Sequence, residues 1–482
     1  MSKYPTGIDH VIVLALENRS FDHMLGYYRK GQPGFLQGEE VNHEDPAVPA
    51  SPVVQVSNTA AYTGDLNVDP SHEVTHVTVQ LFGADVAQLP PPDAPHGVGF
   101  VLDYGQQPGA PVAANIMKCF DPAKLPVLAG LADAFTLCTN WFSSVPGQTW
   151  PNRFFMHCAT AGGCATNDAL RIHDMRTIYQ NLTDAGLDWA IYFHDFPQAL
   201  TLAQLQDSAF RGNFRFFPDF FRDLKNKTLP HYVFLEPRYF DFLQWKANDQ
   251  HPPHDVSLGE HLIADVYEQL RASDYWATSL FVILYDEHGG IYDHVRPPEQ
   301  VPNPDGKVST DPPFDFTRLG LRVPAVLVSP FVPKGAIDET VYDHTSLLAT
   351  VKDIFKLPAF LTERDRWANT FTNRFLKGPR PDADAPRTLT RPGGDPQAAA
   401  FHDEPGAATM TASRVLAAKG ETAAVSRAAL SEFQQSLVDF TNGLDTGDSP
   451  RLRVLQLARR IDDEYDAAVH LRDTAARFLG NG

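Results

Sequence analysis

Short apolar runs alternate with amphipathic segments along most of the chain, and this pattern sets the expected architecture. The runs that read as strands are Val11–Leu16, Leu187–Phe193, Tyr232–Leu235, Ser279–Tyr285 and Val323–Val328. Near-continuous apolar runs of this length are typical of strands buried on both faces. Between two of them, His261–Ser273 carries apolar residues at three- and four-residue steps, which indicates a helix. The alternation predicts an α/β fold, a three-layer α/β/α sandwich around a mostly parallel central sheet.

The pattern changes after Pro379–Pro405, a stretch rich in Pro, Asp and Gly. We therefore expect a large domain over residues 1–385, a linker over 386–405 and a C-terminal helical region over 406–482. Two apolar stripes lie in this region: Leu430, Phe433, Leu437 and Phe440, then Val454, Leu457, Ile461, Tyr465 and Ala468. They predict two helices joined by Asn442–Pro450 as a hairpin. The hairpin either caps the large domain or forms an oligomer contact, so the oligomeric state stays open.

Composition narrows the class of partner. The 482 residues are 43% hydrophobic and 21% charged, which is ordinary for a globular protein. The formal net charge of −19 disfavours nucleic acid and an anionic membrane surface as partners, although a local site for one phosphate remains compatible with it. Four cysteines are too few for a disulfide scaffold in a chain of this length. We expect them to be small buried side chains.

The sequence also predicts a protein without a transmembrane segment. It has no run of about 18 apolar residues, and the N-terminal run His10–Leu16 is too short for a secretory signal. We therefore expect a cytoplasmic protein, or an exported one if a leader is missing from this sequence.

Candidate chemistry lies where two of the predicted strands end. Glu17 and Asn18 follow the first apolar run, and Asp286 and Glu287 follow the fourth. Ligands of open α/β sheets bind beyond the carboxyl ends of strands, and carboxylate and amide oxygens suit a hard cation. Two adjacent acids after a buried strand are costly unless a cation neutralises them. The four side chains predict a metal site, with Gly289–Gly290 allowing a sharp turn beside it; the alternative for either pair alone is a solvated loop.

A third element is the turn within Ser143–Arg153 (SSVPGQTWPNR), which holds the hydroxyl of Thr149. Pro151 is expected to open a helix, and a helix N-terminus favours an anion. A metal beside Thr149 would lower the pKa of its hydroxyl and make it a nucleophile at neutral pH. The alternative is an N-cap hydroxyl, which is common at the start of helices.

These motifs resemble those of the bacterial phospholipase C and acid phosphatase family of the alkaline phosphatase superfamily. The similar stretches are Ile8–Gly26, Leu131–His157, Asp249–Ile263, Leu284–Pro298, Arg322–Gly335 and Tyr342–Val351. ENRSFDHMLG near the N-terminus together with YDEHGG further on is a specific combination. The resemblance implies an alkaline phosphatase-like fold and makes residues 1–385 a phosphoesterase domain.

The resemblance also implies residue roles. Metal ligands would be Glu17, Asn18, Asp286 and Glu287, although related acid phosphatases carry two aspartates at the last pair, so Glu287 is a departure. Thr149 would be the nucleophile, and its oxygen would complete the metal shell. His72 matches a histidine that contacts the phosphoryl group. Further active-site histidines would be His251 and His194, the latter with the weaker match, and His254 competes with His251 for the same role.

Three residues keep two interpretations each. His288 either touches substrate or points away from the acids before it. Asn152 either orients a phosphate oxygen or caps its own turn. His344 either binds a second metal, as a related superfamily histidine does, or serves packing. Likewise, the aromatic stretch Phe210–Phe221 is either an interfacial surface for transient membrane contact or, as is commoner for phenylalanine, core.

The function implied is hydrolysis of a phosphate ester through a phospho-threonine intermediate on Thr149. Charge stabilisation and positioning would lower the barrier, and a histidine would protonate the leaving group. The oxygen-rich ligand set favours one divalent Ca, Mg or Mn ion, whereas the superfamily habit points to Zn. The leading interpretation is a phospholipase C acting on lipids such as phosphatidylcholine. The alternatives are a broad acid phosphatase acting on small phosphomonoesters and a non-catalytic binding module that keeps the fold.

Overall fold

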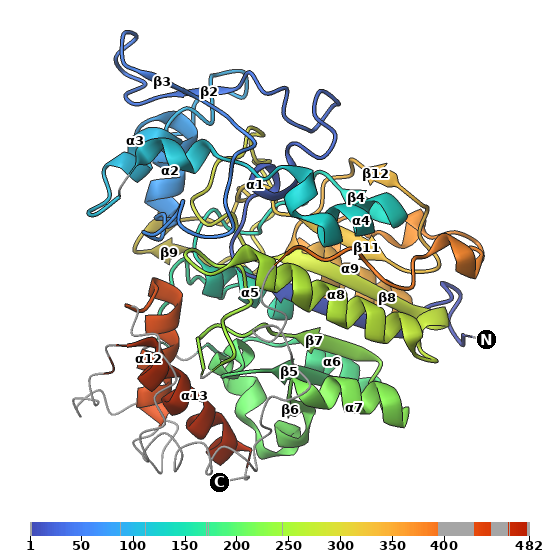
Figure 1. The fold of residues 1–482 in the computed structure, drawn as a ribbon. Helices are drawn as coiled ribbons and strands as arrows, with labels where there is room; N and C mark the ends of the chain where they lie inside the picture. Colours follow the sequence, from blue (N-terminus) through green and yellow to red (C-terminus); the bar gives the residue numbers. More distant parts are fainter. Residues whose placement is uncertain are drawn as a thin grey trace.

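An eight-stranded sheet forms the centre of the molecule (Figure 1). The computed structural model describes residues 2–393, 429–444 and 461–479, except for positions 87, 111, 170, 172, 243 and 462. In spatial order the strands are β12 (Ala336–Asp338), β4 (Thr136–Cys138), β11 (Ala325–Val328), β8 (Ser279–Tyr285), β1 (His10–Leu16), β7 (Tyr232–Leu235), β5 (Trp189–Phe193) and β6 (Phe214–Phe216). Two small hairpins pair β2 (Val41–His43) with β3 (Val53–Gln55) and β9 (Ser309–Thr310) with β10 (Pro313–Phe314).

The two central strands carry the elements of the site to one edge of the sheet. β1 and β8 run parallel, in register from His10 opposite Ser279 to Leu16 opposite Tyr285. Every residue of β1 after His10, and every residue of β8, is buried, as expected for strands covered on both faces. Because the two strands end side by side, the residues that follow them, Glu17 and Asp286, must start from neighbouring positions.

One strand departs from the parallel arrangement. β11 pairs antiparallel with both β8 and β4. The connection from β8 to β11, residues 286–324, is described throughout and contains the β9–β10 hairpin but no helix. The chain therefore re-enters the sheet from the same edge, because a parallel return would need a crossover. The expected mostly parallel sheet is confirmed.

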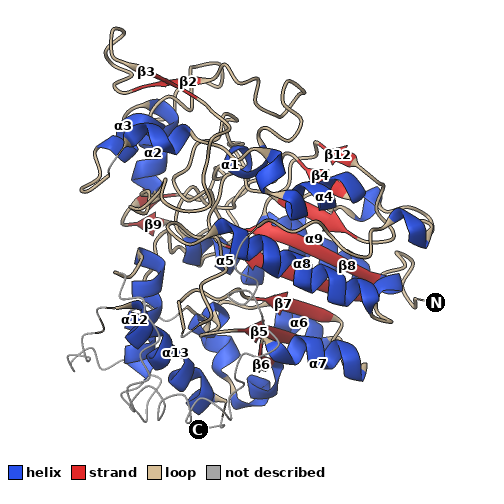
Figure 2. Cartoon of the chain, viewed as in Figure 1, coloured by secondary structure: helices blue, strands red, loops and turns tan. Residues whose placement is uncertain are grey.

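Helices cover both faces of this sheet (Figure 2). The α-helices are α1 (Phe21–Leu25), α2 (Val74–Phe82), α3 (Phe100–Gly105), α4 (Pro126–Ala134), α5 (Thr149–Cys158), α6 (Ile178–Asp184), α7 (Pro218–Asn226), α8 (Val256–Ala272), α9 (His344–Phe355), α10 (Glu363–Trp367), α12 (Glu432–Leu444) and α13 (Glu464–Phe478). α8 contacts α4 and α7 on one face, and α5 contacts α6 and α9 on the other. The predicted three-layer sandwich is confirmed. The predicted helix His261–Ser273 begins earlier, at Val256, where Asp255 caps it.

The C-terminal helices α12 and α13 pack on each other and on the rest of the chain. Phe433 and Leu437 of α12 and Leu471 of α13 are buried in the main hydrophobic core. The ring of Phe433 lies 4.9 Å from that of Tyr239. In the described residues, the pair therefore covers the large domain, as the capping interpretation requires. Val454 and Leu457 of the second predicted stripe lie outside the described residues, and α12 runs through Asn442, into the predicted turn.

The region expected to be a linker begins as packed chain. Arg391 pairs with Asp265 and Glu268 of α8, each at 2.7 Å. Contacts of the large domain thus continue to at least Arg391, and the rest of the expected linker, 394–405, lies outside the described residues.

The structure shows where the four cysteines and the aromatic stretch lie. All four cysteines are buried and free, as expected. In the aromatic stretch, Phe214, Phe216, Phe217 and Phe220 belong to the core, which decides against an interfacial surface there. No helix in the described part of the chain is long and apolar enough to span a membrane.

A buried ion-pair group holds the loops behind the sheet edge. Arg322 donates to Asp22 and to Asp293, both at 2.9 Å, and its guanidinium lies over the ring of Phe21. Burial alone would raise the pKa of Asp22, but Arg322 and His294 hold it below its ordinary value. The side chains of Arg322, Asp22 and Asp293 are fully buried, so each charge depends on its partners instead of water.

We expect Arg322→Met to lower the free energy of unfolding by about 3–5 kcal/mol, because two buried carboxylates lose their cation. The matched control is Arg366→Met, which removes the exposed pair with Glu363 and should cost less than about 1 kcal/mol. Denaturant midpoints measure both. Equal midpoints for the two variants would contradict this account of the buried group.

Candidate active site

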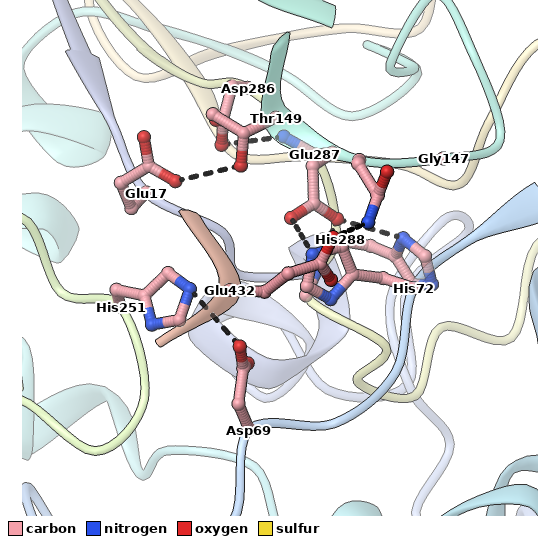
Figure 3. A network of polar contacts seen from close by, with 12 residues as sticks. Glu17, Asp69, His72, Gly147, Thr149, His251, Asp286, Glu287, His288 and Glu432 are labelled. Carbon is pink, nitrogen blue, oxygen red and sulfur yellow. Dashed lines mark hydrogen bonds and ion pairs between the residues drawn. The ribbon is translucent and has the colours of Figure 1, made fainter. Parts of the chain in front are cut away.

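The side chains after β1 and β8 meet beside Thr149 (Figure 3) and share one buried arginine. Arg153 of α5 donates from Nη2 to Glu17 Oε1 at 2.7 Å and from Nε to Asp286 Oδ2 at 3.3 Å. It also donates to the carbonyl of Ala15 at 3.3 Å. The arginine and both carboxylates are fully buried. α5 is thus fixed against the ends of both central strands.

Thr149 is the first residue of α5 and faces the same place. Its hydroxyl donates to Glu17 Oε2 at 3.3 Å. The N-cap of α5 is Gln148, which makes no side-chain capping hydrogen bond, and the helix starts at Thr149 rather than at Pro151. The capping interpretation of the Thr149 hydroxyl is therefore wrong. Because Arg153 lies one helical turn after Thr149, both side chains project from one face of α5.

Burial of the strand-end acids disfavours their charged forms more than Arg153 can offset. Burial raises the pKa of Asp286 to about 7, with Arg153 opposing and Glu287 adding to the rise. Burial and the charge of Asp286 also raise the pKa of Glu17 well above its ordinary value. Three carboxylates beside one guanidinium leave net negative charge in a dry site, which is the electrostatic setting that a bound cation would relieve.

Unsatisfied atoms at the same place suit a metal ion. Both side-chain polar atoms of Asn18 are buried with no hydrogen-bond partner in the structure, and so is Glu287 Oε1. Buried polar atoms are rarely left without partners. With Glu17 and Asp286 they supply the oxygen ligands that a hard divalent ion needs. The residues present therefore fit the metal that the sequence implied.

A glycine turn allows the acids to approach Asn18. Gly289 has φ +64°, and a Cβ there would lie 2.1 Å from the Asn18 carbonyl oxygen. Glu287 Oε2 accepts a hydrogen bond from the Gly289 N–H at 2.6 Å. A side chain at position 289 would push the turn after Glu287 away from Asn18, so the turn requires glycine.

His72 and His288 flank Glu287. His72 Nε2 lies 3.7 Å from Glu287 Oε1, and His288 Nδ1 lies 3.4 Å from Glu287 Oε2. Burial opposes protonation of His72, yet the charges of Glu287 and Asp69 raise its pKa well above the ordinary value. His288 Nε2 lies 2.9 Å from Gln80 Oε1. The structure thus brings both histidines to the candidate metal ligands, and His288 does not point away from the acids.

His251 and His254 have separate surroundings. His251 is 1% exposed, and its Nε2 faces Asp69 at 3.6 Å, within the group drawn in Figure 3. His254 has a carboxylate at each nitrogen, Asp249 at 2.7 Å and Glu464 of α13 at 3.6 Å. The geometry favours His251 for the active-site role, whereas His254 joins α13 to the domain, and substrate contact by His254 stays a prediction.

Two other histidines lie in structural contacts. His194 stacks on Phe217 with ring centroids 4.2 Å apart, and its Nδ1 lies 3.4 Å from Arg238. His344 Nε2 lies 2.5 Å from the Asp286 carbonyl, and its Nδ1 accepts from Trp141 at 3.4 Å. Burial lowers the pKa of His344 to about 4. With both nitrogens engaged, His344 positions the backbone of Asp286, and a second-metal role for it is not supported.

Asn152 bonds its own turn, as one of its two interpretations expects, and its contact with substrate stays a prediction. Its Oδ1 accepts from the Val145 N–H at 2.9 Å, and its Nδ2 donates to the carbonyls of Val145, Gly147 and Gln148 at 3.0–3.1 Å. These four bonds use the amide fully. Asn152 therefore fixes the turn that presents Thr149.

Another acidic group has the spacing of metal ligands, but the positive charge of a buried arginine already neutralises it. Asp22, Asp293 and His294 place one ligand atom each within 4.8 Å of one another. The guanidinium of Arg322 lies between the two carboxylates. This group is therefore an ion-pair cluster, and the metal assignment stays with the strand-end acids.

Residue-by-residue reasoning missed three side chains of the site. Arg153 was visible in the sequence, since its position four residues after Thr149 puts it on the same helix face. Asp69 and Glu432 gave no such signal. Asp69 reaches His251 from the segment before α2, and Glu432 arrives from the C-terminal helix α12.

We expect Asp286→Ala to lose bound metal, because it removes a central oxygen ligand. Elemental analysis of purified protein measures the loss, with circular dichroism to verify folding. The control is Glu339→Ala, at an exposed acid remote in sequence from these ligands, which should keep the wild-type metal content. Unchanged metal in folded Asp286→Ala would contradict the ligand assignment.

Comparison with known proteins matches this site to one family. The Phosphoesterase family matches residues 8–358. Non-specific phospholipase C3 of Arabidopsis thaliana is 38% identical over 79% of this chain and 76% of its own, and non-specific phospholipase C4 is 36% identical over 99% and 86%. A solved protein of the alkaline phosphatase superfamily from Vibrio parahaemolyticus is 10% identical over 48% of this chain and 60% of its own, with a TM-score of 0.30.

The family match spans the strand-end acids, Thr149 and His72. The chain belongs to the Phosphoesterase family and is a phosphoric ester hydrolase.

Proposed function

We propose that the protein is a phospholipase C that hydrolyses phospholipids such as phosphatidylcholine to diacylglycerol and a phosphorylated headgroup. The names of its plant relatives support the lipid substrate. The observation that carries the chemistry is the buried Thr149 hydroxyl, which donates to Glu17 at 3.3 Å. His72 Nε2 lies 3.7 Å from Glu287 Oε1 in the same site.

One divalent ion would be held by Glu17, Asn18, Asp286 and Glu287, with Thr149 as a further ligand. The oxygen donors favour Ca, Mg or Mn, and Zn is the alternative. When bound, the ion supplies positive charge that lowers the pKa of the Thr149 hydroxyl and stabilises negative charge on the phosphoryl group.

In the first step the Thr149 oxygen attacks phosphorus and the bond from phosphorus to the glycerol oxygen breaks. The hydroxyl proton leaves toward Glu17 Oε2, which already accepts it in a hydrogen bond. His72 carries positive charge toward the equatorial oxygens, where charge develops. His251 Nδ1 is engaged with the Pro252 carbonyl, so its Nε2 is the atom available to protonate the glycerol oxygen.

In the second step water attacks the phospho-threonine, and the bond between phosphorus and the Thr149 oxygen breaks. His251 Nε2, deprotonated in the first step, takes the proton from this water. The leaving Thr149 oxygen takes its proton back from Glu17 Oε2, so the products are the phosphorylated headgroup and free enzyme. Asn152 and Arg153 keep Thr149 in line by fixing the turn before it and the helix after it.

The two alternatives differ in what they require. A broad acid phosphatase uses the same parts on a phosphomonoester, so only substrate preference separates it from the lipase. A non-catalytic binding module would not need a nucleophile, and the intact Thr149 beside Glu17 argues against it.

Thr149→Ala should lower kcat by more than about 1,000-fold, because the attacking oxygen is gone, while metal content and fold persist. Thr149→Ser is the matched control, since it keeps the oxygen and should retain measurable turnover. Near wild-type turnover in Thr149→Ala would overturn the nucleophile assignment.

Side-by-side kcat/KM values for phosphatidylcholine and p-nitrophenyl phosphate should favour the lipid. Both activities should vanish on chelation and return with added metal. Preference for the phosphomonoester would establish the acid phosphatase alternative.

A further inference from the structure

Three carboxylates lie near the catalytic His72, whose charge they favour. These rim carboxylates, as we name them, are Asp69, Glu73 and Glu432. Asp69 precedes His72, Glu73 is the N-cap of α2, and Glu432 begins α12. Figure 3 shows Glu432 between His251 on one side and His72 on the other, with Thr149 above it. The rim therefore joins the C-terminal helix to the site.

The three acids are close enough for their charges to act on one another. Burial raises the pKa of Glu432, His72 lowers it, and the charges of Glu73 and Asp69 add to the rise. Glu432 accepts a hydrogen bond from the side chain of Gln148, the residue before Thr149. One rim carboxylate is thus tethered next to the nucleophile.

The rim carboxylates have acceptor atoms that make no hydrogen bond. Among the described residues, no ion pair joins a rim carboxylate to a lysine or an arginine. Asp69 Oδ1 and Glu73 Oε2 are buried atoms without a hydrogen-bond partner in the structure. The side chains of these two residues are 21% and 34% exposed, so a ligand from solvent can reach them. Glu73 Oε2 lies 4.0 Å from His76 Nε2, and Asp69 Oδ2 lies 3.6 Å from His251 Nε2, so each acid has one long contact with a histidine. Carboxylates with only such long contacts favour a cationic ligand.

Two buried histidines add an independent observation. His251 and His72, 1% and 2% exposed, each hold an Nε2 without a hydrogen-bond partner in the structure. Figure 3 draws Glu432 between the two histidines, and the charge of His72 acts on Glu432. Imidazole donors suit phosphate oxygens, and carboxylates near them suit a positive group. Donors and acceptors thus occur together, as a zwitterionic phosphate ester would require.

We propose that the rim carboxylates form a subsite for the ammonium group of a choline or ethanolamine headgroup. This inference rests on the proposed phospholipase function. The ammonium of such a headgroup lies two carbons beyond a phosphate oxygen, and Glu432 is held by Gln148, the residue before Thr149, so one rim carboxylate adjoins the nucleophile in the chain.

The test uses two soluble diesters that differ only in charge. They are p-nitrophenyl phosphocholine and its carbon isostere, p-nitrophenyl 3,3-dimethylbutyl phosphate. Wild-type enzyme should prefer the choline ester in kcat/KM, and Glu432→Gln should reduce this preference by about tenfold, since one charge pair is lost. Glu73→Gln, which breaks no capping hydrogen bond, should reduce it as well.

Asp439→Asn, at an exposed residue of the same helix α12, is the control and should keep the wild-type preference. Equal preference in wild type and both Gln variants would overturn the subsite while leaving the phospholipase function intact. Activity on p-nitrophenyl phosphate with neither diester cleaved would overturn the proposed function and this inference with it. Loss of both diester activities in Glu432→Gln, restored by excess divalent metal, would assign the rim to a metal instead.

Discussion

Arg153 carries a buried positive charge between Glu17 and Asp286, and the geometry of the site depends on that charge. The parallel register of β1 and β8 forces these two carboxylates to neighbouring positions, where they would repel each other in a dry environment. The rigid guanidinium fork offsets part of that repulsion and ties α5 to both strand ends. Because Thr149 is one helical turn earlier, the same contacts place its hydroxyl against Glu17.

The architecture was readable from the sequence because its strands are buried on both faces. Val11–Leu16 and Ser279–Tyr285 appear as continuous apolar runs, and the acids after them mark the sheet edge. The antiparallel direction of β11 was not readable, since apolar periodicity carries no direction. Asn152 shows the limit for the site: an amide in a motif suits a ligand or a turn equally well, and only the structure shows its four hydrogen bonds to the turn.

The C-terminal helices cover the large domain and also bring side chains to it. α13 brings Glu464 to His254, and α12 brings Glu432 to Gln148. Glu432 is more than 280 residues away from Gln148 in the chain, so no local pattern could have predicted the contact. Similarity to non-specific phospholipase C4 extends over 99% of this chain, which includes these helices. The site is therefore completed by the tail of the chain, beyond the residues that match the family.

The central claim is that the phosphoryl group is transferred to the Thr149 oxygen before water releases it. Rapid mixing of metal-loaded enzyme with a phosphodiester substrate, acid quench within one turnover and peptide mass spectrometry tests it most directly. The account predicts a phosphodiester-derived adduct on the peptide that contains Thr149, formed during the first turnover and absent from Thr149→Ala. Full single-turnover product formation with unmodified Thr149 at every quench time would contradict it.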